Sequence, residues 1–246
     1  MPSIGSHLAG ARLIADRLAH RAIEADRGVY FLGATAPDLR GMTRQPREQT
    51  HFFSFDDFTH QDSAERMFAE YPRLSRADEL DAETRAFVAG YLTHLLIDEQ
   101  YIERIYRGYF GAASQLGGDA RADLLDRLLQ YELDRRERED GALDVAGAAL
   151  AETSALADVE FIERETLLRW RGVAVDMASH PPTWERWART AARHAGAAGA
   201  ADDEAAMREV PELLREVLDH VTEQRVREFM DESVEAATLR VREYLQ

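Results

Sequence analysis

The chain has 246 residues, enough to bury a substantial hydrophobic core in one large domain or two small ones. Its 30 basic and 46 acidic side chains give a formal net charge of −16, which disfavours an extended nucleic acid or an anionic membrane as a partner and favours a small substrate. There is no cysteine, which excludes disulfides, thiolate metal sites and cysteine nucleophiles.

The N-terminal part of the chain begins with a predicted helix and continues into an irregular segment. Residues 1–7 lack the positive start and apolar run of a signal peptide, and no stretch is long enough to span a bilayer, so we expect a cytoplasmic protein. Over residues 6–26 the helical period places His7 on the apolar face, which points it inward. Glycine and proline punctuation predicts an irregular segment over residues 30–60.

Helices are predicted for most of the remaining chain. We expect one helix over residues 60–70, a long helix that Asp81 caps, and another that Asp119 caps. Further helices are predicted at 143–170, at 183–197 and as a pair within 203–245, with Pro211 in the first turn of one of them. Alternation typical of strands is nearly absent. The sequence therefore predicts a single all-α domain over residues 1–246.

The long helix after Asp81 carries the most informative pair of residues. His94 and Asp98 lie four positions apart, and Phe87 and Tyr91 recur on the same, largely apolar face. A carboxylate is costly to bury without a charge partner. A divalent metal is the simplest partner that an imidazole one turn away can share. The pair therefore predicts a metal site in the helical core.

His7, His51 and Asp38 are weaker candidates when each is taken alone. A lone inward histidine is commonly a hydrogen-bonded core residue, and Asp38 could cap the segment that follows its Pro-Asp turn. Taken together with His94 and Asp98, they form the set of imidazoles and carboxylates that is typical of zinc sites. Drawing ligands from several helices is how metal sites in helical proteins are commonly assembled.

Four short motifs follow one another in the first 110 residues. They are His7-Leu-Ala, Phe31-Leu-Gly-Ala-Thr-Ala-Pro-Asp38, Thr50-His51-Phe52 and Gly90-Tyr-Leu-Thr-His94-Leu-Leu-Ile-Asp98. In their order and spacing they resemble the bacterial zinc-dependent phospholipases C, whose fold is shared with the zinc-dependent single-strand nucleases. The resemblance implies a multi-helix domain of that type, with the metal-site motifs in residues 1–110 and additional helices in residues 119–246.

The resemblance also implies a division of roles among the five candidate ligands. Residues like Asp38, His51, His94 and Asp98 form one zinc site in the family. The aspartate like Asp98 also reaches a second zinc, which the N-terminal residue and the histidine like His7 help to bind. The resemblance thus implies one or two zinc ions here, and manganese or iron could fill the same donor set.

The chain departs from the family at a third metal position. That position needs two further histidines and a glutamate after the helical pair, and no histidine occurs between His94 and His180. The third site is therefore expected to be absent, or rebuilt from residues such as Glu99, Glu103 or Glu132. This departure separates the chain from an ordinary phospholipase C.

Three arginines lie between two of the proposed ligands. Arg40, Arg44 and Arg47 stand against a single acid in this stretch, although the chain as a whole is strongly acidic. Guanidinium groups suit the oxygens of phosphate, so we predict that these arginines bind substrate. The alternative interpretation is a solvated loop in which the arginines face water.

The leading functional hypothesis is a metal-dependent hydrolase that acts on a phosphoester with a metal-activated water. Asp38 is the predicted catalytic residue, a carboxylate that also steers the water. The substrate would be a small phosphorylated molecule or a phospholipid headgroup, and the sequence leaves the oligomeric state open. The alternative is a non-catalytic, metal-stabilised binding or interaction protein. Three other classes of metal site fit less well. The His-Asp dipeptide and the His-Glu-x-x-His motif do not occur, and a ferritin-like site needs a pair of Glu-x-x-His motifs, of which the sequence holds one, Glu48–His51.

Overall fold

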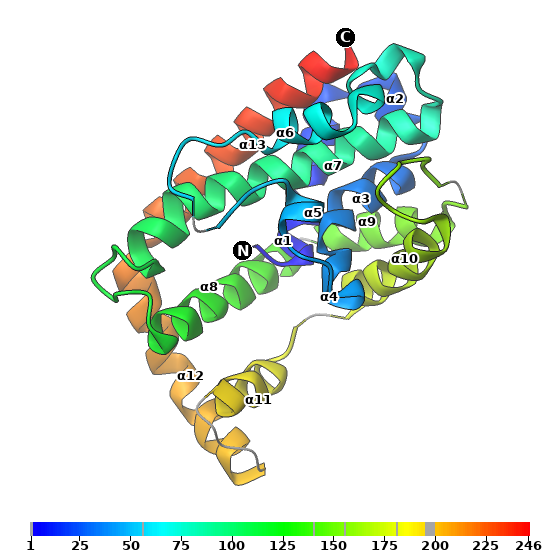
Figure 1. The fold of residues 1–246 in the computed structure, drawn as a ribbon. Coiled ribbons are helices and arrows are strands. Elements are labelled where there is room, and N and C mark those ends of the chain that lie inside the picture. Colours follow the sequence, from blue (N-terminus) through cyan, green and yellow to red (C-terminus); the bar gives the residue numbers. More distant parts are fainter. Residues whose placement is uncertain (1, 56, 140, 155, 181, 195–199) are drawn as a thin grey trace.

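The computed structural model describes residues 2–55, 57–139, 141–154, 156–180, 182–194 and 200–246, and in these ranges the chain folds into helices with no strand (Figure 1). The predicted all-α fold is confirmed. The α-helices are α1 (Ile4–Leu18), α2 (Arg21–Glu24), α3 (Arg27–Thr35), α4 (Arg40–Thr43), α5 (Glu48–His51), α6 (Ser63–Glu70), α7 (Ala82–Tyr101), α8 (Ala120–Glu139), α9 (Ala142–Glu152), α10 (Arg164–Ser179), α11 (Trp184–His194), α12 (Ala200–Val221) and α13 (Glu223–Leu245). Three 3₁₀ segments, η1 (Ala36–Leu39), η2 (Pro72–Ser75) and η3 (Ala77–Glu79), and a π-helical segment, η4 (Ile102–Phe110), complete the set.

Short polar side chains start the helices, as the sequence predicts. The Asp81 carboxylate accepts a hydrogen bond of 2.7 Å from the Thr84 N–H at the start of α7. The Asp119 carboxylate accepts one of 2.9 Å from the Ala122 N–H at the start of α8. Each cap satisfies an N–H group that has no partner inside its own helix, so both predicted helix starts are confirmed.

The predicted boundaries in the first third of the chain are wrong in two places. The helix expected over residues 6–26 ends at Leu18, because Ala19 adopts a left-handed conformation with φ 42° and His20 caps the next short helix. The segment expected to be irregular, residues 30–60, begins inside α3, where Gly33 is a helical residue. Gly33 serves close packing there and does not break the helix.

Two predictions in the last third of the chain also need correction. The helix expected over residues 143–170 is divided into α9, which ends at Glu152, and α10, which begins at Arg164, and the described residues between them, 153–154 and 156–163, are not helical. Pro211 lies inside α12 and not in a first turn. The helix continues through the proline, although its ring removes one backbone hydrogen bond.

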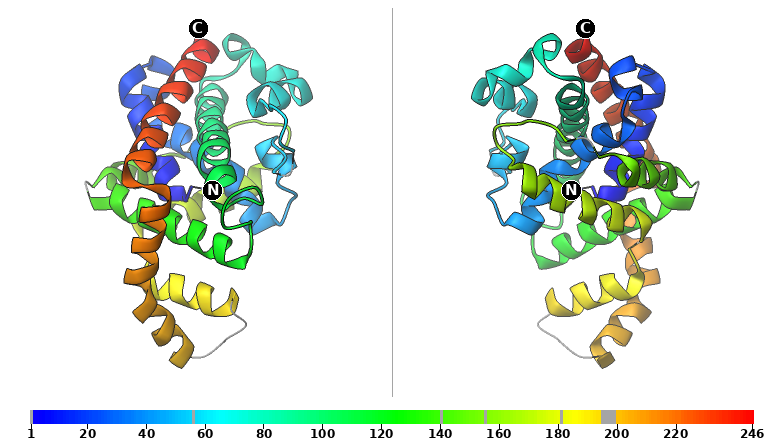
Figure 2. Two further views of the ribbon diagram at one scale, coloured as in Figure 1. Left: turned by 90° about the vertical axis from the view of Figure 1, so that its left-hand side faces the viewer. Right: turned by 90° about the vertical axis from the view of Figure 1, so that its right-hand side faces the viewer.

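The helix α7 runs through the middle of the fold. Helices α1, α3 and α13 pack against it, and α13 lies beside it along most of its length in Figures 1 and 2. One hydrophobic cluster joins α1, α3, α7, α9 and α10, and a second joins the C-terminal end of α7 and η4 to α8, α11, α12 and α13. In both views of Figure 2, α11 and the first part of α12 extend beyond the other helices. Of the described helices, none has the length and apolar content needed to cross a membrane.

Two glycines allow α3 and α7 to touch backbone to backbone. A Cβ atom on Gly33 would lie 2.0 Å from the Phe87 carbonyl oxygen, and one on Gly90 would lie 2.0 Å from the Tyr30 carbonyl oxygen. Both separations are far below van der Waals contact, so neither position accepts a side chain without moving a helix. This close approach brings the Ala34 carbonyl of α3 to within hydrogen-bonding distance of His94 on α7.

The Gly90→Ala variant is expected to lose about 3 kcal/mol or more of unfolding free energy, because the added methyl group meets backbone that cannot rotate away. Gly172→Ala is the matched control, since a Cβ atom at this position in α10 meets nothing within 4 Å. That variant is expected to gain about 0.5–1 kcal/mol from helix propensity. Urea unfolding of both variants measures the effects, and a Gly90→Ala protein as stable as the parent would contradict the packing.

A candidate metal centre in the helical core

The fold brings the five predicted ligands together from four different elements. His7 comes from α1, Asp38 from η1, His51 from the end of α5, and His94 and Asp98 from the middle of α7. The three histidines and Asp98 are buried, and only the Asp38 side chain, 23% exposed, reaches solvent. The convergence of residues this far apart in sequence is a property of the tertiary fold.

Asp98 occupies the middle of the cluster. Its Oδ1 lies 3.3 Å from His7 Nε2, and its Oδ2 lies 3.3 Å from His51 Nε2 and 3.7 Å from His94 Nε2. His51 Nε2 in turn lies 3.4 Å from His94 Nε2 and 3.5 Å from Asp38 Oδ1. Every one of these side chains directs its terminal donor atom towards the others.

The spacing of the donor atoms fits a metal ion. Metal–nitrogen bonds of about 2.1 Å in a tetrahedral shell place neighbouring ligand atoms ~3.4 Å apart. Two overlapping groups of donors have ligand atoms that all lie within 4.8 Å of one another: His7, His94 and Asp98 form one, and Asp38, His51 and His94 form the other. His94 belongs to both groups, so its single free nitrogen is the donor on which the whole cluster depends.

Two of the imidazoles are oriented by contacts that their Nδ1 atoms make outside the cluster. His94 Nδ1 lies 2.9 Å from the Ala34 carbonyl oxygen, to which it donates, so Nε2 is the nitrogen that faces the cluster. His51 Nδ1 lies 2.9 Å from the Thr50 hydroxyl. The Thr50 carbonyl accepts a hydrogen bond from the Tyr91 hydroxyl. The contacts of Tyr91 with Thr50 and of His94 with Ala34 join different helices, so the sequence alone does not predict them.

Three buried polar atoms of the cluster lack a hydrogen bond. They are both ring nitrogens of His7 and the Oδ1 atom of Asp98. The His7 ring stacks on the His94 ring, with centroids 3.6 Å apart and planes 12° from parallel. A buried polar atom without a partner costs about 1–3 kcal/mol, and a cation between His7 Nε2 and Asp98 Oδ1 would remove two of these penalties.

The electrostatics of the cluster keep His7, Asp38 and Asp98 in the forms that bind metal. Burial, followed by the neighbouring His94, lowers the pKa of His7 to about 4, so this imidazole is neutral at pH 7. Burial opposes ionisation of Asp38, but the hydrogen bond from His51 and the charge of His94 hold its pKa at about 2. The same kinds of contact outweigh burial at Asp98 and hold its pKa well below the usual range. Neutral imidazoles and ionised carboxylates are the protonation states that metal ligands require.

An arginine-lined cavity adjoins the cluster. Arg47 Nη2 lies 2.9 Å from Asp98 Oδ2, and its Nε and Nη1 are buried without a hydrogen bond. Arg47 and Arg40 both line a cavity of about 450 Å³, and Arg40 Nε is likewise buried and unbonded. Arg44 is exposed, at the left-handed residue that ends α4, and is not one of the residues that line this cavity. The fold therefore brings two of the three predicted arginines to the site.

The far wall of this cavity comes from α8, which sequence analysis did not connect with the site. Asp123, Asp126, Arg127 and Gln130 line it, spaced so that they share one helical face. A polar stripe on an otherwise leucine-rich helix was the available signal. The packing of α8 against α1, η4 and the C-terminal end of α7 brings the stripe to the His/Asp cluster.

The glutamates considered for a third metal position have other roles. Glu99 accepts a hydrogen bond from the Ser63 N–H, and Glu132 pairs with Arg135 and Arg136. Glu103 is exposed on η4. Within the described part of the chain, none of these three carboxylates joins a group of potential metal ligands.

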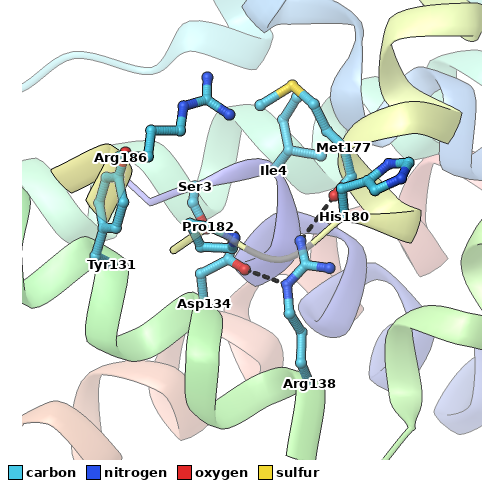
Figure 3. A pocket seen from close by; sticks show the side chains of 9 residues that line it. All are labelled: Ser3, Ile4, Tyr131, Asp134, Arg138, Met177, His180, Pro182 and Arg186. Atoms are coloured by element: carbon cyan, nitrogen blue, oxygen red, sulfur yellow. Dashed lines mark hydrogen bonds and ion pairs between the residues drawn. The ribbon is translucent and has the colours of Figure 1, made fainter. Parts of the chain in front are cut away.

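A carboxylate on α8 fastens the start of α1, which carries His7. Asp134 accepts hydrogen bonds from the Ser3 hydroxyl and, at 3.1 Å, from the Gly5 N–H, and it also pairs with Arg138 (Figure 3). Arg138 donates in turn to the Met177 carbonyl at the end of α10. This network fixes the N-terminal turn of α1 between two other helices and thereby sets the position of His7.

Comparison with known proteins leaves the family open. A scan against protein-family models finds no match, and searches of curated proteins and of solved structures find none either. Function is therefore argued from the geometry of the cluster and the cavity.

Proposed function

We propose that the protein is a metal-dependent hydrolase of phosphoesters, with chemistry like that of the zinc-dependent phospholipases C. The supporting observation is the convergence of five buried or half-buried donors beside a cavity that carries two arginines. The order and spacing of the four sequence motifs point to the same class. Zinc suits the mixed nitrogen and oxygen donors best, and manganese or iron would also be accepted.

The five donor residues have two kinds of role in this proposal, metal binding and orientation of the attacking water. His7, His51, His94 and Asp98 would hold the metal, with Asp38 at the exposed edge. A bound zinc ion would supply Lewis acidity and lower the pKa of a water molecule. Asp38, ionised and partly open to solvent, accepts a hydrogen bond from that water and directs it towards phosphorus.

Arg47 and Arg40 bind the phosphate in this proposal. Both side chains line the cavity, and Arg40 Nε, Arg47 Nε and Arg47 Nη1 are buried without a hydrogen bond. Phosphate oxygens match the fork of a guanidinium group. The contact between Arg47 and Asp98 also ties the phosphate-binding group to the metal ligands at a fixed distance.

The Arg47→Gln variant is expected to lose about 100-fold in kcat/KM for phosphoester hydrolysis while it retains metal, because a preorganised positive charge is removed from the reacting phosphate. Arg44→Gln is the matched control: the arginine is only three residues away but exposed, so its variant is expected to stay within about twofold of the parent. Phosphate release and metal content are measured on both proteins. Equal losses in the two variants would contradict a role for the cavity.

A second candidate function is a metal-stabilised binding protein without turnover. The observation in its favour is that four of the five potential ligands, His7, His51, His94 and Asp98, are buried, as ligands of a closed structural metal site would be. A screen of phosphomonoesters, phosphodiesters and short-chain phospholipids with zinc, manganese or iron supplied separates the two. Turnover of any of them that disappears in His94→Ala supports the hydrolase, whereas a metal-loaded protein inactive on all of them favours the binding protein.

A further inference from the structure

The cavity beside the metal cluster has two chemically different walls. On the cluster side, Arg47 and Arg40 offer only donors. On the α8 side, the carboxylates Asp123 and Asp126 offer acceptors, Arg127 offers donors, and the Gln130 side chain offers both. A phosphate on the arginines would therefore leave the rest of its molecule against a wall of mixed donors and acceptors.

The acceptors on α8 are held in place. The Asp126 carboxylate is buried and receives hydrogen bonds from the Tyr101 hydroxyl at 2.6 Å and from the Gln130 amide at 2.7 Å. Tyr106, from the π-helical segment η4, lies 3.4 Å from Asp123 through its hydroxyl. Preorganised polar groups of this kind discriminate strongly, because a ligand that cannot hydrogen-bond leaves them desolvated and unpaired.

An apolar face completes the cavity. The rings of Phe55 and Tyr106 lie with centroids 4.5 Å apart, and both residues line the cavity. Aromatic rings beside carboxylates and amides suit a compact group that has C–H faces and hydroxyl edges. Hydroxyl groups both donate and accept, so they match the α8 wall better than an ammonium group, which only donates, or a hydrocarbon chain, which does neither.

We propose that the cavity takes the phosphate monoester of a polyhydroxylated, water-soluble alcohol, of which a sugar phosphate is the simplest example. The phosphate lies on Arg47 and the hydroxyls lie on α8. This inference rests on the proposed hydrolase function. In the reaction, a water oxygen forms a bond to phosphorus, the ester P–O bond breaks, and the released alcohol oxygen takes up a proton from solvent, which gives inorganic phosphate and the free polyol.

The charges of the cavity disfavour two other kinds of substrate. The acyl chains of a lipid would cover the charged groups of Asp123 and Arg127 without hydrogen-bonding them, which is unfavourable. A second phosphate group would meet the two carboxylates of the same wall, Asp123 and Asp126, which outnumber its one arginine. A cavity of about 450 Å³ is also in the size range that encloses a small ligand.

Sorbitol 6-phosphate and hexyl phosphate test the proposal, because both are six-carbon monophosphates and only the first carries hydroxyls. Calorimetric titration of the zinc-loaded, full-length protein is expected to give a Kd for sorbitol 6-phosphate at least tenfold lower than that for hexyl phosphate. In the Asp123→Asn variant this ratio is expected to fall below about threefold. Asp123 is exposed, so the variant keeps the fold, and Asp126→Asn provides a second, more buried test. Asp231→Asn, on the exposed side of α13, is the control that keeps the tenfold ratio.

Phosphate release from the two esters, measured in parallel, separates this inference from the hydrolase proposal. A tenfold preference in binding without any phosphate release supports the assignment of the cavity and overturns the hydrolase. Release from both esters with equal Kd values supports the hydrolase and overturns the inference about its substrate. Tighter binding of hexyl phosphate, or a ratio unchanged in both α8 variants, also overturns the inference.

Discussion

The His94→Ala variant is expected to lose metal binding by a factor of 100 or more, together with all phosphoester hydrolysis. The reason is geometric: His94 Nε2 belongs to both groups of donor atoms, so its removal leaves each with two ligands. Loss of a ligand or of its supporting contact characteristically lowers metal affinity by 10–100-fold or more. Elemental analysis and zinc titration of the folded variant, with the fold checked by circular dichroism, measure the effect.

His180→Ala is the matched control for this experiment. His180 directly follows the last residue of α10. Like His94, it has an aspartate four positions away, Asp176, but its side chain is 75% exposed. Its replacement is expected to leave metal content unchanged. Metal retained in full by the His94→Ala protein would exclude the cluster as the binding site.

Metal binding is expected to weaken steeply below neutral pH. Burial works against the charged form of His94, but Asp98 and Asp38 outweigh it and raise the pKa of this histidine above 6.5 in the metal-free protein. A raised pKa means that the proton is held more tightly, so it competes with metal as the pH falls. Apparent zinc affinity should then decrease by about tenfold for each pH unit below that pKa.

His7 and Asp38 do not contribute to this pH dependence in the range that is tested. His7, with a pKa of about 4, and Asp38, with a pKa of about 2, carry no competing proton above pH 5. Competition with a chromophoric chelator between about pH 5.5 and pH 8 measures the dependence. An affinity that stays constant over this range would contradict coordination through His94.

The helical class of the fold could be predicted from the sequence, and so could the starts of α7 and α8. Those predictions depend on local features: the period of apolar residues and a short polar cap such as Asp81. The missed elements depend on tertiary contacts. The sequence around Gly33 predicts a loop, but the residue lies in α3. A glycine stands there because the contact with the Phe87 carbonyl on α7 leaves no room for a side chain.

The five candidate ligands could be predicted as a set from the sequence. The spacing of His94 and Asp98 puts both on one inward helix face, and the motif order adds His7, Asp38 and His51. The second wall of the cavity was not predictable, because Asp126 reaches the site only through the packing of α8 against η4 and the end of α7. Nothing in the local sequence separates Arg47, which contacts Asp98, from the exposed Arg44.

The most direct test of the account is an anomalous diffraction measurement at the zinc absorption edge, on crystals of the protein grown with zinc. If the His/Asp cluster is a metal centre, a strong peak is expected in the core, about 2.0–2.3 Å from His94 Nε2 and from a carboxylate oxygen of Asp98. A peak confined to surface carboxylates, or no peak between His94 and Asp98, would contradict a metal centre in the core.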